Sequence, residues 1–395
     1  MNKLKLKTVI AGATRNSLKI VLSMLLASAT SIYAQEEAYF NPLRTAVPSL
    51  TIAPDARGGA MGDIGAATEP DVFSQYWNPA KYVFAPSKAG VGFSYTPWLA
   101  KLVSDINLFN VSGYSKVGSS ENLALGASIR YFSMGDITLS TEHQPNTGEA
   151  SPYEMAADVS ISLKASEHLS IAAAVRYIRS DLGGGTDAGQ EPAVGVAADI
   201  AGYYNTQVDV GSRESLLGVG LNISNIGGKV SYDGGSTEVF LPTNLRLGAS
   251  LQMPLDNYNT LAINADINKY LVPTPPGMDA SPEDKKKYEE TAAISGIFSS
   301  FNDAPGGMKE ELQEVVWSLG AEYAYDRKFF ARAGYSRENP AKGNRQYFAL
   351  GGGIKLTALQ IDMAYLISST PSNPLDQTLR LSLSFDMDGM KGLLQ

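Results

Sequence analysis

Alternation of apolar and polar residues with a period of two is the feature that most constrains how this chain folds. In residues 379–385, for example, leucine or phenylalanine occupies every second position, with arginine and serine between them. Successive side chains of a β-strand point to opposite faces, so each such segment is predicted to be a strand with one apolar face. Fourteen segments follow this pattern, at about 88–97, 105–117, 121–136, 153–164, 168–181, 193–207, 214–226, 243–254, 258–270, 314–325, 328–338, 344–357, 358–370 and 376–387.

The connections between these strands alternate in length. Short polar turns such as Gly118-Ser119-Ser120 and Asp326-Arg327 are followed along the chain by longer loops. The longer loops lie near 137–152, 182–192, 227–242 and 271–313. An even number of long strands with short turns at one end and long loops at the other is typical of outer-membrane barrels. A soluble sandwich, the alternative, usually has strands of about five or six residues.

We therefore predict an all-β fold, a 14-stranded antiparallel transmembrane β-barrel over residues 88–387, with short periplasmic turns and long extracellular loops. The polar strand faces would point into the lumen and carry Arg130, Asp158, Arg176, Asp199, Arg246, Asp266, Glu322, Arg332, Lys355, Asp362 and Arg380. Charges of mixed sign are expected to pair with one another and with a plug rather than to form a ligand site. A barrel of fourteen strands is wide enough to need filling.

Residues 35–87 are the predicted plug, or hatch. Their central run, PDARGGAMGD at 54–63, sets glycines and a proline among charges and favours tight turns over a regular strand. Trp77-Asn78-Pro79-Ala80 follows, where Pro79 holds Asn78 out of the helical region. The candidate residues of this motif, structural and able to contact a partner, are Pro54, Asp55, Arg57, Gly58, Gly59, Gly62, Asp63, Trp77, Asn78 and Pro79. An ordinary irregular N-terminal segment is the alternative.

Residues 1–34 are predicted to be a secretory signal peptide. Five basic residues and no acid precede an apolar run at 20–26, and small residues lead to a cleavage site after Ala34. The apolar run is too short for a membrane anchor, since a transmembrane helix needs about 20 apolar residues. The chain contains no cysteine, so neither a lipoprotein anchor nor a disulfide is expected.

Charge and histidine content argue against several classes of function. The formal net charge is −8, and loss of the five basic residues of the signal peptide makes it −13, so a nucleic-acid partner is not expected. His143 falls in a long loop and His168 at a short turn of the opposite end, so they cannot share a metal. The glycine-rich stretch 183–189 has no helix after it to hold a phosphate. We predict no cofactor, no metal and no catalytic residues, hence no enzyme.

The run at 54–63, together with Trp77-Asn78-Pro79-Ala80-Lys81 and the fourteen strands, resembles the PorV (LptO) family of the type IX secretion system. The resemblance covers essentially the whole mature chain. That family is grouped with FadL-type fatty-acid transporter barrels, whose hatch carries an Asn-Pro-Ala motif, matched here at 78–80. The longer run before that tripeptide favours the PorV family. One departure is that Phe385 is followed by ten further residues, including a C-terminal tail at 388–395, whereas many outer-membrane barrels end on an aromatic.

The resemblance implies a non-enzymatic carrier and scaffold in the bacterial outer membrane, among lipid and lipopolysaccharide. Members of the family receive cargo by its C-terminal signal domain at the Sov (SprA) translocon and pass it to an attachment complex of PorU, PorQ and PorZ. PorU would remove the signal domain and attach the cargo to lipopolysaccharide. The long loops, above all 271–313, would form the partner surface, and Ser281 is predicted to begin a helix there.

Two other functions stay open from the sequence. A FadL-type channel for uptake of hydrophobic small molecules would need a mostly apolar pocket in the lumen. A lipopolysaccharide-modifying hydrolase would have to rely on His168 and Ser170, its only candidate residues.

Overall fold

The structure is a computed structural model that describes residues 40–389 except 102, 104, 142–143, 185–189 and 371–374. The predicted signal peptide at 1–34, the start of the plug at 35–39 and the end of the C-terminal tail from residue 390 lie outside the described residues. The same holds for His143 and for residues 185–189 of the glycine-rich loop.

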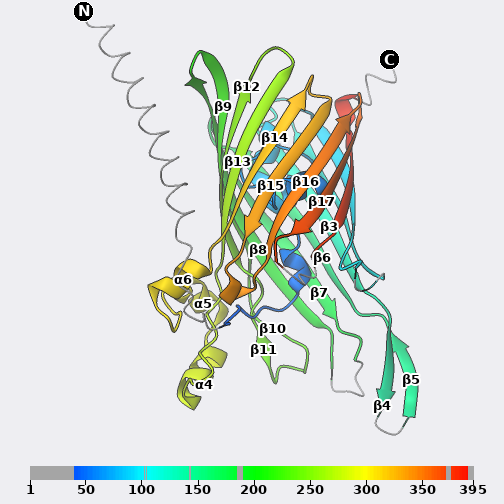
Figure 1. The fold of residues 1–395 in the computed structure, drawn as a ribbon, viewed down its shortest axis with the longest axis vertical. Coiled ribbons are helices and arrows are strands. Elements are labelled where there is room, and N and C mark those ends of the chain that lie inside the picture. Colours follow the sequence, from blue (N-terminus) through cyan, green and yellow to red (C-terminus); the bar gives the residue numbers. More distant parts are fainter. Residues whose placement is uncertain are drawn as a thin grey trace, which may run out of the picture. The chain divides into compact units, whose positions relative to one another are not determined.

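Fourteen antiparallel strands form a closed barrel, as predicted (Figure 1). They are β1 (Ala89–Pro97), β2 (Ile106–Val117), β3 (Leu123–Met134), β6 (Tyr153–Lys164), β7 (Leu169–Asp181), β8 (Ala193–Val210), β9 (Arg213–Gly227), β12 (Asn244–Pro254), β13 (Asn259–Tyr270), β14 (Val316–Tyr325), β15 (Phe329–Arg337), β16 (Gln346–Lys355), β17 (Leu359–Ser368) and β18 (Leu379–Asp386). Each strand pairs with its neighbours in chain order, and β18 pairs with β1, with Leu381 opposite Tyr95. Closure leaves no unpaired strand edge, which is the condition for a sheet in lipid.

The apolar face of the strands points outward. Val159 on β6 is 63% exposed, while its neighbours Asp158 and Ser160 are buried. Aromatic side chains gather near both ends of the outer face, with Trp317 close to the long loops and Tyr325 close to the short turns. At about 3.3 Å per residue these two are about 26 Å apart along β14, and aromatic residues at both ends of the apolar band are typical of outer-membrane barrels. Within the described part of the chain, no helix has the length and apolarity to cross a bilayer.

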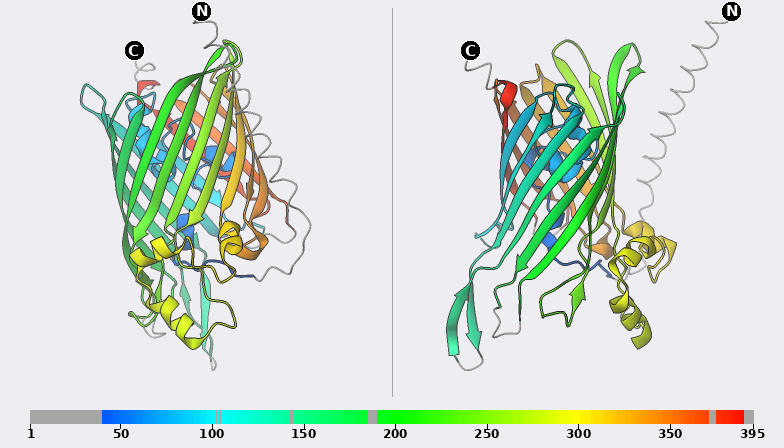
Figure 2. Two further views of the ribbon diagram at one scale, coloured as in Figure 1. Left: turned by 90° about the vertical axis from the view of Figure 1, so that its left-hand side faces the viewer. Right: turned by 180° about the vertical axis from the view of Figure 1, so that it is seen from behind.

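All of the long connections leave one end of the barrel (Figures 1 and 2). They carry the hairpin β4 (Ile137–Thr141) and β5 (Gln144–Ala150), the short pair β10 (Val230–Ser231) and β11 (Glu238–Val239), a 3₁₀ turn at Pro340–Lys342, and the helices α4 (Pro282–Glu290), α5 (Ala293–Ser299) and α6 (Met308–Gln313). Ser281 caps α4 as predicted, because its hydroxyl accepts a hydrogen bond from the Asp284 amide at 3.1 Å. The loops are therefore more structured than the sequence indicated.

Residues 40–87 are called the plug below. Residues 40–47 run along the long-loop end, where the Asn41 and Ala46 amides donate to the carbonyls of Ala341 and Phe240, and the rest of the plug lies inside the barrel (Figure 2). They contain α2 (Ala56–Ala60), α3 (Ser74–Trp77) and 3₁₀ turns at Pro48–Thr51 and Pro79–Phe84. Apolar side chains attach the plug to the wall: Val72, Phe73 and Tyr82 pack against Tyr114 on β2 and Ala124 on β3. Four smaller apolar clusters also join plug and wall, for example Ile52 with Leu108 and Phe132. The polar contacts between plug and wall form the candidate site.

Candidate functional site

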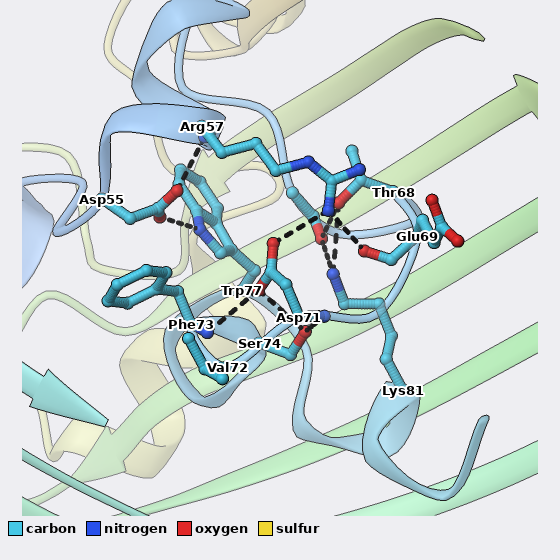
Figure 3. A network of polar contacts seen from close by, with 12 residues as sticks. Asp55, Arg57, Thr68, Glu69, Asp71, Val72, Phe73, Ser74, Trp77 and Lys81 are labelled. Carbon is cyan, nitrogen blue, oxygen red and sulfur yellow. Dashed lines mark hydrogen bonds and ion pairs between the residues drawn. The ribbon is translucent and has the colours of Figure 1, made fainter. Parts of the chain in front are cut away.

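Asp55 joins the two halves of the predicted plug motif. It precedes α2 in an extended conformation, and its Oδ2 accepts a hydrogen bond from the Gly58 amide at 2.7 Å, so it is the N-cap. Its Oδ1 accepts the indole Nε1 hydrogen of Trp77 at 2.6 Å (Figure 3). Burial, with a further contribution from the charge of Asp71, raises the pKa of Asp55 to about 6. One buried carboxylate thus fixes both α2 and α3.

Gly58 of the motif and the nearby Gly65 allow close approach to Trp77. A Cβ atom at Gly58 or at Gly65 would overlap the indole ring. Gly62 has a φ of +86° and lies against the backbone of Tyr335, so it needs both a left-handed conformation and the absence of a side chain. The glycines therefore serve packing as well as the turns that the sequence predicts.

Asn78 holds three segments together. Its Oδ1 accepts a hydrogen bond from the Ala80 amide at 3.1 Å, and its Nδ2 donates to the carbonyl oxygens of Ala66 and Gly202, each at 2.9 Å. Gly202 is on β8, so the Asn-Pro-Ala turn is bonded directly to the wall. The neighbouring carbonyl of Pro79 accepts a hydrogen bond from Ser162 on β6 at 2.7 Å.

Lys81 is fully buried beside this turn (Figure 3). Its Nζ donates to the Gly65 carbonyl at 2.7 Å and to the Thr68 hydroxyl at 3.2 Å. Burial lowers the pKa of Lys81 to about 8. The ammonium therefore binds plug backbone and is not presented to the lumen.

A chain of alternating charges links the plug to one side of the wall. The Nε and Nη2 atoms of Arg57 donate to the two carboxylate oxygens of Glu322 on β14, each at 3.0 Å, and its Nη1 donates to Asp71 at 3.0 Å. Glu322 also accepts from the Nε of Arg332 at 2.5 Å, and Arg332 donates through Nη1 to Asp362 at 2.6 Å. Bidentate arginine–carboxylate pairs fix orientation as well as position.

Two further wall carboxylates and one wall arginine hold the plug. Asp63 forms an ion pair with Arg380 on β18 and accepts the Tyr347 hydroxyl hydrogen at 2.6 Å. Asp266 on β13 accepts hydrogen bonds from the Gly65 and Ala66 amides at 2.9 and 3.0 Å. On β6, Asp158 accepts from the Gln75 amide group at 2.6 Å and also contacts Arg176 at 3.1 Å. The plug is therefore bonded to strands around the barrel.

The charges predicted to face the lumen do so, and all of them except Lys355 are buried. Most pair with one another or with the plug, as the sequence predicted; Arg176, for example, lies between Asp158 and Asp199, at 3.1 and 2.8 Å. Of the ten motif residues, only Arg57 and Asp63 are not fully buried. Their side chains are available to the wall rather than to a partner at the surface.

The structure does not bring His168 and Ser170 together as a reactive pair. His168 is exposed, and its Nδ1 is bonded to the Asn205 carbonyl at 2.9 Å. Ser170 is fully buried and donates to the carbonyl of Ala80 at 2.6 Å. Among the described residues, no group of three or more His, Cys, Asp or Glu side chains is arranged to hold a metal.

Sequence analysis did not assign a role to the glycines of the wall. A Cβ atom at Gly334 on β15 or Gly320 on β14 would overlap the Met61 backbone, and one at Gly220 on β9 would overlap Ala66. These glycines make room for the plug. Their place on the lumen-facing side of each strand is the signal that could have revealed this.

Two separate cavities remain on either side of the plug, and they have no lining residue in common. The one toward the long loops, called the lumen chamber below, has a volume of about 90 Å³ and is lined by Tyr76, Arg246 and Asn268 among others. The one toward the short turns has about 210 Å³ and is lined by Arg57, Glu322 and others. Both carry charged side chains.

Comparison with known proteins gives one match in sequence and several in fold. The family model described as "Type IX secretion system protein PorV" matches residues 34–277. A TodX monoaromatic hydrocarbon channel mutant lacking S2 and S3 is 15% identical with a TM-score of 0.50, over 84% of this chain and 98% of that one. The toluene transporter TodX of P. putida is 13% identical with a TM-score of 0.48, over 84% and 98%.

A FadL homologue of Pseudomonas aeruginosa is 12% identical with a TM-score of 0.43, over 88% of this chain and 100% of that one. No curated protein sequence matches the chain. At these identities the solved structures share only the fold, a barrel of outer-membrane type.

Proposed function

Since this chain belongs to the PorV family of type IX secretion system proteins, we propose that it is a non-enzymatic carrier and scaffold of that system. In this role it binds the C-terminal signal domain of secreted cargo at a Sov/SprA-type translocon. It then delivers the cargo to an attachment complex of PorU, PorQ and PorZ type proteins at the cell surface. The long loops face outward and the short turns face the periplasm.

The observation that carries this proposal is the plug, which fills the lumen and is bonded to strands around the wall. Displacing the plug to open the lumen would separate Arg57 from Glu322 and Asp63 from Arg380. Leaving one member of a buried ion pair without its partner costs about 3–5 kcal/mol. Several such costs at once make a passage for protein through the lumen unfavourable, which assigns partner binding to the surface.

The loop between β13 and β14 supplies a structured surface for a partner. Its helices α5 and α6 expose large apolar side chains, with Phe298 at 75% and Leu312 at 67%. Exposed apolar patches of this kind mark protein or membrane contacts. The loop is not loosely attached, because Glu314 accepts bonds from Lys269 on β13 and from Lys342 in the connection between β15 and β16, at 2.6 and 2.9 Å. A preorganised surface loses less conformational entropy on binding.

A FadL-type uptake channel is the runner-up, and only the shared fold favours it. Its substrate would need an apolar cavity in the lumen. In both cavities beside the plug, arginines, acids and amides stand among the apolar lining residues, and an alkyl chain cannot form hydrogen bonds with these polar groups. The carrier function is therefore the better supported proposal.

Affinity purification from detergent-solubilised outer membranes tests the carrier function. Tagged mature protein should recover a very large outer-membrane translocon and secreted proteins that share a C-terminal domain. The variant Phe298→Asp should lose these partners, whereas Lys286→Ala, on the exposed α4 of the same loop, should keep them. Recovery of the barrel alone with bound fatty acid, or normal surface levels of cargo after gene deletion, would contradict the proposal.

A further inference from the structure

Arg246 differs from the other arginines that line the lumen chamber. Arg176, Arg345 and Arg380 each form an ion pair with a carboxylate. Arg246 is only 8% exposed, yet none of the ion pairs between described residues includes it, and its Nε donates to the neutral amide oxygen of Asn268 at 2.7 Å. A buried guanidinium without a carboxylate is unfavourable unless an anion comes to it.

Aromatic rings of the plug hold this guanidinium in place. The Arg246 Cζ lies 4.5 Å from the ring centroid of Trp77 and 5.1 Å from that of Tyr76. Arg130 lies over the same Tyr76 ring at 4.7 Å, and its Nη1 donates to the carbonyl of Ser49 at 2.5 Å. The guanidinium groups of Arg246 and Arg130 thus both lie over the Tyr76 ring. This contact fixes the planes of the two groups and leaves their N–H edges for hydrogen bonding.

The neighbouring acid does not neutralise Arg246 by direct contact. Asp266 on β13 attracts Arg246 without forming an ion pair with it; its Oδ2 accepts hydrogen bonds from the plug amides of Gly65 and Ala66, and its buried Oδ1 has no hydrogen-bond partner. Glu338, which also lines the lumen chamber, pairs with Arg345. Arg246 therefore lines the chamber without an ion pair to any carboxylate among the described residues.

The other lining groups fit a peptide better than an alkyl chain. Near Arg246 the lining includes the amides of Asn244 and Asn268 and the hydroxyls of Ser318 and Ser336. The Asn244 Oδ1 is buried and has no hydrogen-bond partner in the protein. A buried acceptor of this kind needs a donor such as a peptide N–H.

We propose that the lumen chamber binds the free carboxylate at the end of a peptide chain, with Arg246 as its charged anchor and Asn244 as an acceptor for the adjacent amide. A guanidinium matches the planar carboxylate group. A volume of about 90 Å³ holds a carboxylate and a few further atoms but not a folded domain. The lining also includes Trp98 and Leu375 at the long-loop end, so a chain end would enter from that side. The proposal does not depend on the carrier function.

Fluorescence of Trp77 reports binding directly, because its ring lies under Arg246. The substitutions Trp98→Phe and Trp317→Phe leave it as the only one of the three tryptophans. The purified full chain in detergent is titrated with N-acetyl-glycylglycine, with its C-terminal amide, and with octanoate as a carboxylate on an alkyl chain. The peptide acid should give a saturable change, and the peptide amide and octanoate should each bind at least tenfold more weakly.

Variants distinguish the loss of the Arg246 anchor from general effects on charge and folding. Arg246→Gln should abolish the response to the peptide acid, and Arg246→Lys should retain part of it. Lys355→Gln removes the same charge on the opposite side of the plug and should change nothing. Heat-modifiable migration on gels establishes that each variant is a folded barrel. Equal binding of acid and amide, an unchanged response in Arg246→Gln, or tighter binding of octanoate than of the peptide would overturn the proposal.

Discussion

Asp63 in the plug and Arg380 in the closing strand β18 form an ion pair between residues 317 positions apart in the chain. Arg380 is 1% exposed, so its guanidinium depends on Asp63 for compensation of its charge. The pair can form only when the last strand has been added, because β18 closes the barrel on β1. It therefore couples the position of the plug to completion of the wall.

Replacing Asp63 with alanine should lower the free energy of unfolding by about 3–5 kcal/mol, because it leaves a buried guanidinium unpaired. Denaturant titration followed by heat-modifiable gel migration measures the change. Lys101→Ala breaks an ion pair with Asp376 at the surface and should leave the unfolding midpoint unchanged. Similar midpoints for the two variants would contradict the assigned role of Asp63.

Gly58→Ala should displace Trp77 from its site, because the added methyl group overlaps the indole ring. The expected cost is about 1–3 kcal/mol, as for overpacked cores. A red-shifted Trp77 emission in the protein without Trp98 and Trp317 would show the displacement. Gly228→Ala, where a Cβ atom meets nothing within 4 Å, is the matched control and should leave the emission unchanged.

Stability should depend on pH through Asp55. Its pKa in the folded protein is about 6, above the ordinary value of 3.8, so the folded state binds more protons than the unfolded state between these values. This contribution is fully present below about pH 4 and is lost as the pH rises through about 6. In Asp55→Asn, which keeps the shape of the side chain, that part of the pH dependence should disappear. Unfolding midpoints of both proteins between pH 4 and 7 test this, and parallel curves would reject it.

Gly334→Ala should disturb docking of the plug without preventing strand formation, because the added methyl group meets the backbone of Met61 and not a side chain. Trypsin should then cleave after Arg57, a bond protected in the wild type by the buried ion pair with Glu322. Gly352→Ala is the control, since its Cβ atom has ordinary space. Equal resistance of both variants to trypsin would show that the wall glycine is not needed for the plug.

His168→Ala should leave folding unchanged, because the ring is exposed. Ser170→Ala should cost about 1 kcal/mol, because it removes the buried hydrogen bond to the Ala80 carbonyl. The midpoints of denaturant unfolding measure both effects. Loss of a lipopolysaccharide-modifying activity in His168→Ala would support the hydrolase function. The structure does not favour that function, because His168 is exposed and Ser170 is buried.

The barrel could be predicted from sequence because the residues of each strand reflect the environments of its two faces. Lipid on one side and a polar lumen on the other impose an alternation that is visible within ten residues, as in 379–385. The hairpin β4–β5 and helices α5 and α6 were missed, because no lipid imposes such a pattern on loops beyond the barrel. The ends of the long connections were nevertheless close to those observed.

The contacts of the plug could not be predicted in the same way. The motif at 54–63 indicated tight turns, but the wall partners of Arg57 and Asp63 lie more than 260 residues further along the chain. Alternation shows that Glu322 faces the lumen and does not show which plug residue meets it. Only the three-dimensional register of strands and plug brings the pairs together, and the unpaired state of Arg246 is visible only there.

The glycines of the wall bear on the permeability of the membrane. Where Gly220, Gly320 and Gly334 face the lumen, the wall presents backbone without side chains to the plug. A barrel that lost the plug would leave a water-filled hole through which ions and small solutes could diffuse. The plug therefore closes what would otherwise be an open route for small solutes across the membrane.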